Sequence, residues 1–447
     1  MKIKIFFLIC SAVALASCSG SFDKANEDFK IKFDSGQYEQ AADTIVAATI
    51  MNKEANNIYL GGLQCGNGYL WANNSEKTDK CFSVVDSVLS GEIEEDSSYK
   101  IKNYEKIMAK TYQGINAISQ QDEFTKQLFN QAYDLQKDNI NESGEEIESL
   151  REQFAKDQEK LKEAGVSNIP SIDSLVAEIE AQSVDVENSV VPMKDFANPY
   201  TTWLMALYDG ATGDKNNAES GMKKVAEFAP KNTFVKSDIK GLDKGSVYVV
   251  FENGKVGPVQ ARSLVPNSLK VLTQPLTAIG INAGIELTIP DLFPGTKALD
   301  KLSISTDQEQ TDTQFLASVD SIVKTDLDKY KTSNIMKSVS FEVGKIAAAT
   351  VAGIAANRAA KNSPFRDIAT FAAVTAVMSV KKPWDLRSWD SIPNEIQIAR
   401  VSMPKDHHIV INNNFSIDIP EEAKNAIVFV RIPTANAVPG IVVGTLN

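Results

Sequence analysis

Gly245-Ser-Val-Tyr-Val-Val-Phe-Glu-Asn-Gly254 is the stretch at which a helical part of the chain gives way to a β-rich part. Its β-branched and aromatic residues favour a strand over Gly245–Glu252. The Asn253-Gly254 pair that follows is typical of a hairpin, because a type I′ turn needs positive φ at both positions. We therefore expect a second strand over Lys255–Val259 and a change from helices to strands at about Phe234.

The β-rich part is expected in two pieces, residues 234–312 and 383–447. In the first piece, apolar runs predict further strands at Leu269–Leu272, Ile279–Ile289 and Leu302–Ser305. In the second piece, runs separated by turn residues predict strands at Glu395–Ser402, His407–Ile411, Phe415–Ile419 and Ala426–Ile432. The end of the chain is therefore expected to form a small β-sandwich or an appended sheet, and the whole chain an α+β fold.

A helical block over residues 313–382 separates these two pieces. The buried side of its first helix is expected to carry Phe315, Val319, Ile322 and Leu327. Two Ala-rich runs follow, Ile346–Ala356 and Ile368–Val380. Both are shorter than the ~20 residues that span a bilayer. Two closely packed buried helices are one interpretation, and a membrane-inserting hairpin or oligomeric segment is the alternative.

Residues 18–233 predict a helical region with internal repeats. Gly36-Gln-Tyr-Glu-Gln-Ala41 resembles the turn of a tetratricopeptide (TPR) repeat, in which a small residue packs where two helices meet. A second copy fits residues 66–82, and a clearer one starts at Gly213 and ends at Pro230, because proline cannot continue a helix. An irregular helical bundle is the alternative. Only a solenoid of repeats makes a concave groove for a peptide or protein partner.

Two features punctuate this helical region. Asn198 and Pro199 are suited to start the last repeat, as helix cap and first-turn proline, and a binding rim that includes Tyr200 is the second interpretation. Residues 142–196 interrupt the repeats as a charged insertion. Asp157 falls where an apolar seam residue is needed, so a protruding helix or hairpin arm is expected rather than a long coiled coil.

The first 17 residues resemble the signal peptide of a bacterial lipoprotein. A basic start precedes the apolar run Ile5–Ala14, and Leu15-Ala-Ser-Cys18 resembles a lipobox. The resemblance implies that Cys18 carries a diacylglycerol thioether and becomes the first residue of the mature protein, durably anchored by its acyl chains. Ser19 favours the outer membrane, with the protein facing the periplasm. An ordinary secretory signal or an N-terminal membrane helix is the alternative.

Charge and cysteine content limit the partners and the compartment. The 447-residue chain carries a formal net charge of -12, which makes it a poor binder of nucleic acid and of anionic lipid. Cys10 leaves with the signal peptide and Cys18 is the anchor, so Cys65 and Cys81 remain. They lie eight residues either side of Asn73, where we expect a helix–helix turn. A disulfide is permitted in an exported compartment, and two small buried thiols are the alternative.

The sequence offers little catalytic chemistry. The two histidines, His407 and His408, are adjacent on a predicted strand and would point to opposite faces. Motifs for a metal, a nucleotide or an activated nucleophile are not found in the sequence. We therefore expect no cofactor, no metal and no enzymatic activity. A hydrolase that uses two convergent carboxylates is the less favoured alternative.

The most distinctive cluster is Trp384-Asp-Leu-Arg-Ser-Trp-Asp-Ser-Ile-Pro393. Arg and Trp are favoured anchors of protein interfaces, which makes Asp385, Arg387 and Trp389 candidate interaction residues. The alternative is a packed corner, in which Arg387 pairs with Asp385 or Asp390 and the tryptophans cover the sheet.

These pieces, in this order, resemble a family of bacterial outer-membrane lipoproteins of unknown function with TPR-like repeats. The features that carry the resemblance are Cys18, Asn198-Pro199, Glu252-Asn-Gly254 and Asp385-Leu-Arg-Ser-Trp389. Members are often encoded near lipoproteins that activate peptidoglycan synthases. The resemblance implies a non-enzymatic, lipid-anchored scaffold that binds envelope proteins through its repeats. A membrane-associated oligomeric assembly that uses residues 346–380 is the alternative, and the oligomeric state stays open.

Overall fold

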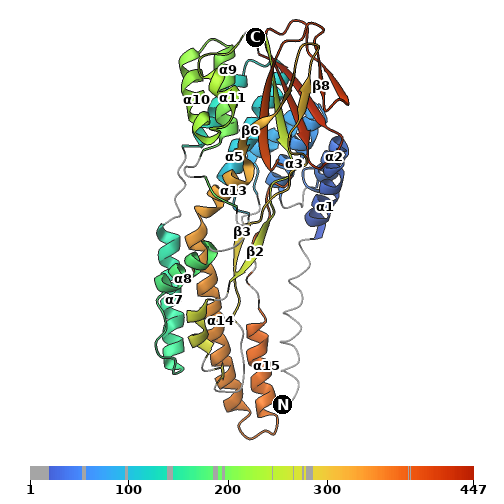
Figure 1. Ribbon diagram of the computed structural model, residues 1–447. Helices are drawn as coiled ribbons and strands as arrows, with labels where there is room; N and C mark the ends of the chain where they lie inside the picture. The colour runs from blue at the N-terminus through green and yellow to red at the C-terminus, as the bar shows by residue number, and fades with distance from the viewer. Residues whose placement is uncertain are drawn as a thin grey trace.

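A computed structural model gives the arrangement of the chain. It describes residues 20–52, 57–95, 99–137, 144–184, 190–193, 197–243, 245–264, 266–273, 276–277, 285–380, 382 and 384–446. The fold is α+β and elongated, with a head and a leg (Figure 1). The leg comprises residues 144–184, 259–292 and 331–380, and the head comprises the other described residues.

One side of the head is a layer of helices. These are α1 (Gly20–Asp34), α2 (Tyr38–Ala48), α3 (Ile58–Trp71), α4 (Ser75–Leu89), α5 (Asn103–Ser119), α6 (Thr125–Leu135), α9 (Pro199–Ala211), α10 (Lys215–Phe228) and α11 (Thr233–Asp238). Short turns with positive φ join four successive pairs, at Gly36, Asn73, Gln121 and Gly213. The turns at Gly36, Asn73 and Gly213 lie where the sequence predicts a break between helices.

Glycines allow α3 to pack in backbone contact with its two neighbours. A Cβ added at Gly66 would lie 2.8 Å from the ring of Phe82 on α4. A Cβ added at Gly68 would lie 2.9 Å from the Cβ of Ala42 on α2. The glycines of this helix therefore serve close helix packing.

The strands of the head form two sheets. The first has the order β11-β10-β1-β7-β6, with β1 (Ser246–Asn253), β6 (Gln314–Ser318), β7 (Glu395–Ser402), β10 (Ala426–Ile432) and β11 (Gly440–Thr445). The second has the order β5-β4-β8-β9, with β4 (Ser303–Ser305), β5 (Gln310–Asp312), β8 (His408–Ile411) and β9 (Phe415–Asp418). The segments 234–312 and 383–447, which the sequence presents as separate pieces, therefore share both sheets.

The predicted hairpin at Asn253-Gly254 is wrong. Gly254 does have a positive φ of 70°, but the chain then leaves the sheet. Strand β1 pairs in parallel with β10 and antiparallel with β7, and β2 (Val259–Leu264) pairs with β3 (Leu287–Leu292) instead. Gly254 adopts the positive φ that its residue type favours, but the strands that pair with β1 come from distant parts of the sequence.

Two further predictions of local structure are corrected. Leu269–Leu272 belongs to the 3₁₀-helix η2 (Asn267–Thr273) and not to a strand. Phe315 lies in strand β6 and is exposed, so the helical block starts only at α13 (Val319–Asp328). Of the predicted strand Ile279–Ile289, residues 279–284 lie outside the described residues.

The five-stranded sheet is covered on both faces. Along β1, Tyr248 and Val250 belong to the core shared with the helical layer. The alternate residues Val247, Val249 and Phe251 pack against the four-stranded sheet. A β-sandwich thus forms, as one of the two expectations had it, but its strands come from both β-rich pieces of the chain.

The inner face of the helical layer is occupied by the chain's own sheet. A Cβ added at Gly440 of β11 would lie 2.8 Å from the Cβ of Trp71 on α3. A Cβ added at Gly444 would lie 2.1 Å from the side chain of Ile118 on α5. Tyr38 donates a hydrogen bond of 3.0 Å from its hydroxyl to the carbonyl of Arg431 on β10. The concave groove expected from a free solenoid is therefore filled.

The leg consists of the two-stranded sheet and two helical hairpins, which extend away from the head (Figure 1). Helices α7 (Gly144–Glu163) and α8 (Ile172–Val184) form one, and α14 (Lys331–Ala359) and α15 (Arg366–Met378) form the other. Phe154, Leu161, Leu175, Ile335, Val339 and Val343 form part of a core shared by α7, α8 and α14. Asp157 is buried at this seam, and its carboxylate lies 2.7 Å from the Lys160 ammonium. Among the described helices, α14 is the one long and apolar enough to cross a membrane, although half of its most apolar window is buried.

A disulfide joins Cys65 on α3 to Cys81 on α4, with the two Cα atoms 5.9 Å apart. Both residues are buried. The double variant Cys65→Ala/Cys81→Ala is expected to lose about 3 kcal/mol of unfolding free energy, because the unfolded chain is no longer constrained by this loop. Urea unfolding followed by circular dichroism measures the loss. Wild-type protein in dithiothreitol should show a similar shift, and equal midpoints for the oxidised, reduced and variant proteins would contradict the prediction.

Candidate functional site

The second tryptophan of the sequence cluster lies in the interior of the head. Trp389 is fully buried and stacks edge-on against Tyr112 of α5, with ring centroids 5.5 Å apart. Its indole N–H donates to the Ser391 hydroxyl over 2.8 Å. The same hydroxyl accepts a 2.9 Å hydrogen bond from the Asn67 side chain of α3. Trp389 therefore fastens the helical layer to the sheet and is not reachable by a partner in this structure.

Asp385 and Arg387 form a tight pair on the side of the head. Their side chains are 2.7 Å apart, and the Arg387 guanidinium stacks over the Tyr99 ring at 5.1 Å. Arg387 also donates to the Asn57 side chain, and Lys102 donates to the Arg387 carbonyl over 3.0 Å. The structure thus favours the packed-corner interpretation of the cluster over an exposed binding anchor.

Asn198, Pro199 and Tyr200 start helix α9. The Asn198 side chain accepts hydrogen bonds from the backbone N–H groups of Tyr200 and Thr201, and Pro199 occupies the first helical turn. These are the roles that the residue types favour at a helix start. Tyr200 points inward and donates over 3.0 Å to the Glu252 carboxylate. Only the Pro199 edge of this motif borders a cleft.

A buried network around Glu252 and Arg431 joins β1, β10 and the helices. The Glu252 carboxylate accepts from the hydroxyls of Tyr112, over 2.9 Å, and Tyr200. The Arg431 guanidinium donates to the carbonyls of Glu252, Gly254 and Ser391 over 3.1, 2.6 and 3.0 Å. Both charged side chains are fully buried. Sequence reasoning missed this pair, although each is the one charged residue in its strand.

The network makes stability depend on pH. Burial raises the pKa of Glu252 to about 7, although Arg431 and the two tyrosines favour its ionised form. Because this folded-state pKa lies above the ordinary value of 4.5, the folded protein binds the proton more tightly than the unfolded chain. The unfolding free energy contributed by this carboxyl should fall by about 3 kcal/mol as pH rises from about 4.5 to about 7.

Urea unfolding between pH 5 and pH 8 measures this slope. Glu252→Gln should reduce this slope, whereas Glu39→Gln, at an exposed position, should leave it unchanged. Asp238, whose pKa burial also raises to about 7, leaves a residual slope of the same sign. A wild-type protein that becomes more stable between pH 5 and pH 7 would contradict the assignment.

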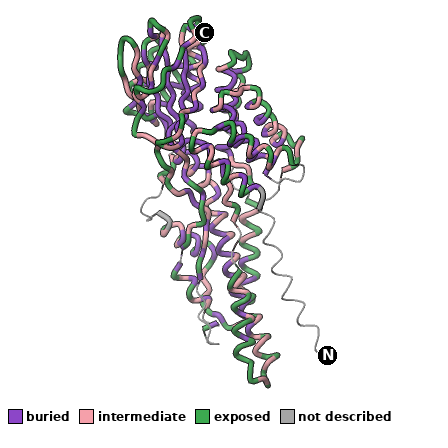
Figure 2. Tube along the Cα trace, turned by 90° about the vertical axis from the view of Figure 1, so that its right-hand side faces the viewer, coloured by how far each residue is buried: buried purple, intermediate pink, exposed green. Residues whose placement is uncertain are grey.

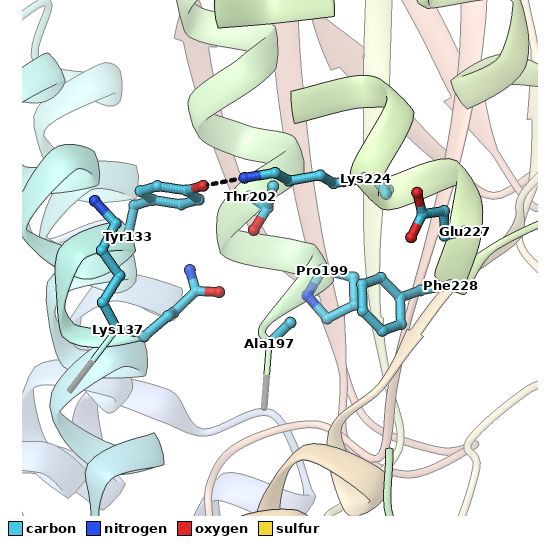
Figure 3. Close-up of a pocket in the computed structure, with 10 residues that line it drawn as sticks. Tyr133, Lys137, Ala197, Pro199, Thr202, Lys224, Glu227 and Phe228 are labelled. Atoms are coloured by element: carbon cyan, nitrogen blue, oxygen red, sulfur yellow. Dashed lines mark hydrogen bonds between the residues drawn. The ribbon is translucent and has the colours of Figure 1, made fainter. Parts of the chain in front are cut away.

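The open site in the helical layer is a cleft between α6, α9 and α10 (Figure 3). It holds about 280 Å³. Its lining consists of Tyr133, Gln136, Lys137, Ala197, Pro199, Thr202, Lys224, Val225, Glu227 and Phe228. We call these ten residues the Pro199 cleft. They come from α6, α9 and α10 and from the residues that flank α6 and α9, and Figure 3 shows Tyr133 and Phe228 at opposite sides of the cleft.

The Pro199 cleft combines apolar surface with hydrogen-bond donors. Lys137 and Lys224 lie 5.0 and 5.3 Å from the centre of the Tyr133 ring, and Lys224 donates to the Tyr133 hydroxyl over 2.6 Å. Gln136 accepts from the backbone N–H of Asn198, whereas its buried side-chain nitrogen finds no acceptor among the described residues. Such a cleft suits a peptide with a carbonyl or carboxylate beside an apolar side chain.

The described residues contain no cluster of three or more His, Cys, Asp or Glu side chains that could hold a metal ion. His407 lies in a turn with a φ of 56°, and only His408 belongs to strand β8, where its ring nitrogen lies 2.6 Å from the Asp418 carboxylate. The expectation that both histidines share a strand is therefore corrected.

Comparison with known proteins adds no relative. The chain matches no protein-family model, and no curated protein or solved structure is significantly similar to it. Cys18 and the rest of the lipobox lie outside the described residues, which start at Gly20.

Proposed function

We propose that this protein is a non-enzymatic, lipid-anchored scaffold of the bacterial cell envelope. Cys18 holds it in the outer membrane facing the periplasm, and its TPR-like helical layer binds a protein partner, with peptidoglycan synthesis as the process suggested by the family resemblance. The observation that carries the proposal is the Pro199 cleft, an opening in the helical layer that combines apolar surface with hydrogen-bond donors.

The packing of the helices supports a repeat origin for this layer. The Cβ of Ala206 on α9 lies 2.6 Å from the position a Cβ would take at Gly221 on α10, the same kind of small-residue crossing as Gly66 makes with Phe82. Because the sheet covers the inner face, a partner reaches the layer at the Pro199 cleft, at the junction of α6 with the α9–α10 pair. An extended peptide segment fits an opening of this size and polarity.

Pull-down from detergent-solubilised envelope tests the proposal. The bait is the lipidated chain with Tyr133→Ala/Lys224→Ala in the cleft, compared with Lys24→Ala/Ile31→Ala on the exposed side of α1. A partner recovered by the wild type should fall by at least about tenfold with the cleft variant, since buried aromatic contacts dominate such interfaces, and should be retained with the α1 variant. Recovery of nothing above an unrelated lipidated protein would contradict the proposal.

A separate measurement tests the anchor. Cys18→Ala should abolish incorporation of a labelled fatty acid and release the protein from the membrane fraction. Retained label in this variant would show that the lipid is attached elsewhere or that the resemblance to a lipobox misleads.

A further inference from the structure

The end of the leg carries an unusual concentration of exposed apolar side chains. Phe365, Ile368 and Phe371 have 64%, 66% and 56% of their surface exposed. They follow one another at the start of α15, and Val351 of α14 is 52% exposed close to the same end. Five of the twelve large apolar residues exposed in the described part of the chain lie within Val351–Val380. A soluble protein rarely exposes such a cluster without a partner.

Among the described residues, helix α15 has neighbours on one side only. Its buried residues are Thr370 and Val374, which face α14. No charged residue occurs in Ile368–Val380, so the remaining surface of the helix is apolar or weakly polar. The exposed colour along the lower leg in Figure 2 agrees with this one-sided packing. Figure 1 shows the α14–α15 connection at the end of the leg farthest from the head.

The charge at this end is opposite to that of the rest of the chain. Residues 346–380 contain four charged side chains, Arg358, Lys361, Arg366 and Asp367, for a net charge of 3 - 1 = +2. The whole chain carries -12, so the remainder carries -14. The basic groups flank the exposed Phe365 in the sequence and lie within ten residues of Ile368. Apolar side chains bordered by basic ones suit the boundary of a bilayer, because the apolar groups can contact acyl chains while the basic groups contact phosphate headgroups.

We infer that the tip of the leg, Arg358–Phe371, is a surface that docks on a lipid bilayer. Phe365, Ile368 and Phe371 enter the acyl boundary, and Arg358, Lys361 and Arg366 contact lipid phosphates. Shallow docking fits better than crossing, because the uncharged part of α14 below Lys345 spans only twelve residues, or about 18 Å, against about 30 Å of hydrocarbon. Helix α1 starts on the leg side of the head (Figure 1), so a lipid at the proposed anchor would place the tip towards the same membrane.

The test uses the chain from Ser19 onward, which keeps every described element and carries no lipid. With Cys65 and Cys81 in their disulfide, it offers no other thiol. A fluorophore on Asn362→Cys should shift to the blue with vesicles of phosphatidylcholine and phosphatidylglycerol, and lipids with spin labels on the acyl chain should quench it. The same fluorophore on Glu421→Cys, at an exposed site of the head, should do neither.

Matched variants identify the groups responsible. Phe365→Ser/Ile368→Ser/Phe371→Ser should lower vesicle partitioning at least about tenfold. Three exposed apolar residues of the head provide the control variant, Ile31→Ser/Phe124→Ser/Val438→Ser, which should partition like the wild type. Arg358→Gln/Lys361→Gln should remove the preference for phosphatidylglycerol over pure phosphatidylcholine.

Several outcomes would overturn the inference. Absence of binding to either vesicle, or binding unchanged by the triple tip variant, would reject the tip as the contact. A dimer in solution that the tip variant dissolves, without vesicle binding, would show that the tip meets a second copy of the chain. Because no lipid anchor and no protein partner enter these measurements, a negative result would leave the proposed scaffold function to its own tests.

Discussion

Arg431→Met is expected to lower the unfolding free energy by about 3–5 kcal/mol. The substitution leaves the Glu252 carboxylate fully buried without its counter-charge and removes the donor from three backbone carbonyls. A domain is stable by only about 5–15 kcal/mol, so much of the stability of the head rests on this side chain. The loss should be larger at pH 8 than at pH 5, because Glu252 is mostly protonated at the lower pH.

Guanidinium unfolding followed by circular dichroism measures the loss. Arg151→Met is the matched control, because Arg151 pairs with Asp173 at an exposed position of the leg, where such pairs contribute about 0–1 kcal/mol. The double variant Glu252→Gln/Arg431→Met should recover part of the stability, since no unpaired charge remains. An Arg431→Met protein within 1 kcal/mol of the control would show that the buried network contributes little.

Trp389→Ala is expected to cost about 3–5 kcal/mol, the usual range for removing a large aromatic side chain from a core. The cavity would open between α5 and the sheet, where the Trp389 ring meets Tyr112, and the Asn67–Ser391 contact would lose its support. Trp384→Ala is the matched control. Trp384 is only half-buried and bonds to the Thr288 carbonyl in the leg, so its removal should cost less than half as much.

This pair of variants also decides what the tryptophan cluster does. A packed corner predicts that Trp389→Ala lowers stability and leaves partner capture by the folded protein unchanged. A binding anchor predicts the reverse, a loss of capture at wild-type stability. Chemical unfolding and the pull-down, both carried out on the same folded preparations, separate the two.

Local signals in the sequence predict local structure well. The residues Gly36, Asn73 and Gly213 mark turns because their backbones adopt positive φ, which glycine and asparagine tolerate. Helix starts such as Asn198-Pro199 follow from hydrogen bonding within four residues. The Ala-rich helices and most of the C-terminal strands also lie close to the positions that their residue patterns predict, because these patterns depend only on neighbouring residues in the sequence.

Non-local features could not be predicted from these signals. The partner of β1 is β10, and nothing near Asn253-Gly254 indicates that the strand after the turn will pair elsewhere. The Pro199 cleft combines α6, α9 and α10, which only the folded chain brings together. The sequence held a weak signal for the Glu252–Arg431 pair, because each is the one charged residue in its strand. That signal could be used only once the pairing of β1 with β10 was known.

The parallel contact between β1 and β10 also sets an order of events during synthesis. Glu252 on β1 and Arg431 on β10 are 179 residues apart in the chain. Strand β10 lies between β1 and β11 in the sheet, so β11 can join the sheet only after β10 has paired with β1. At roughly 5–20 residues per second, the ribosome needs about 10–40 s to deliver β10 after β1. Throughout that interval helices α1–α11 of the head are complete, while β10 and β11, which cover part of their apolar inner face, are still missing. The nascent chain is therefore most prone to aggregation or capture by a chaperone late in synthesis, and C-terminal truncation reproduces that state permanently.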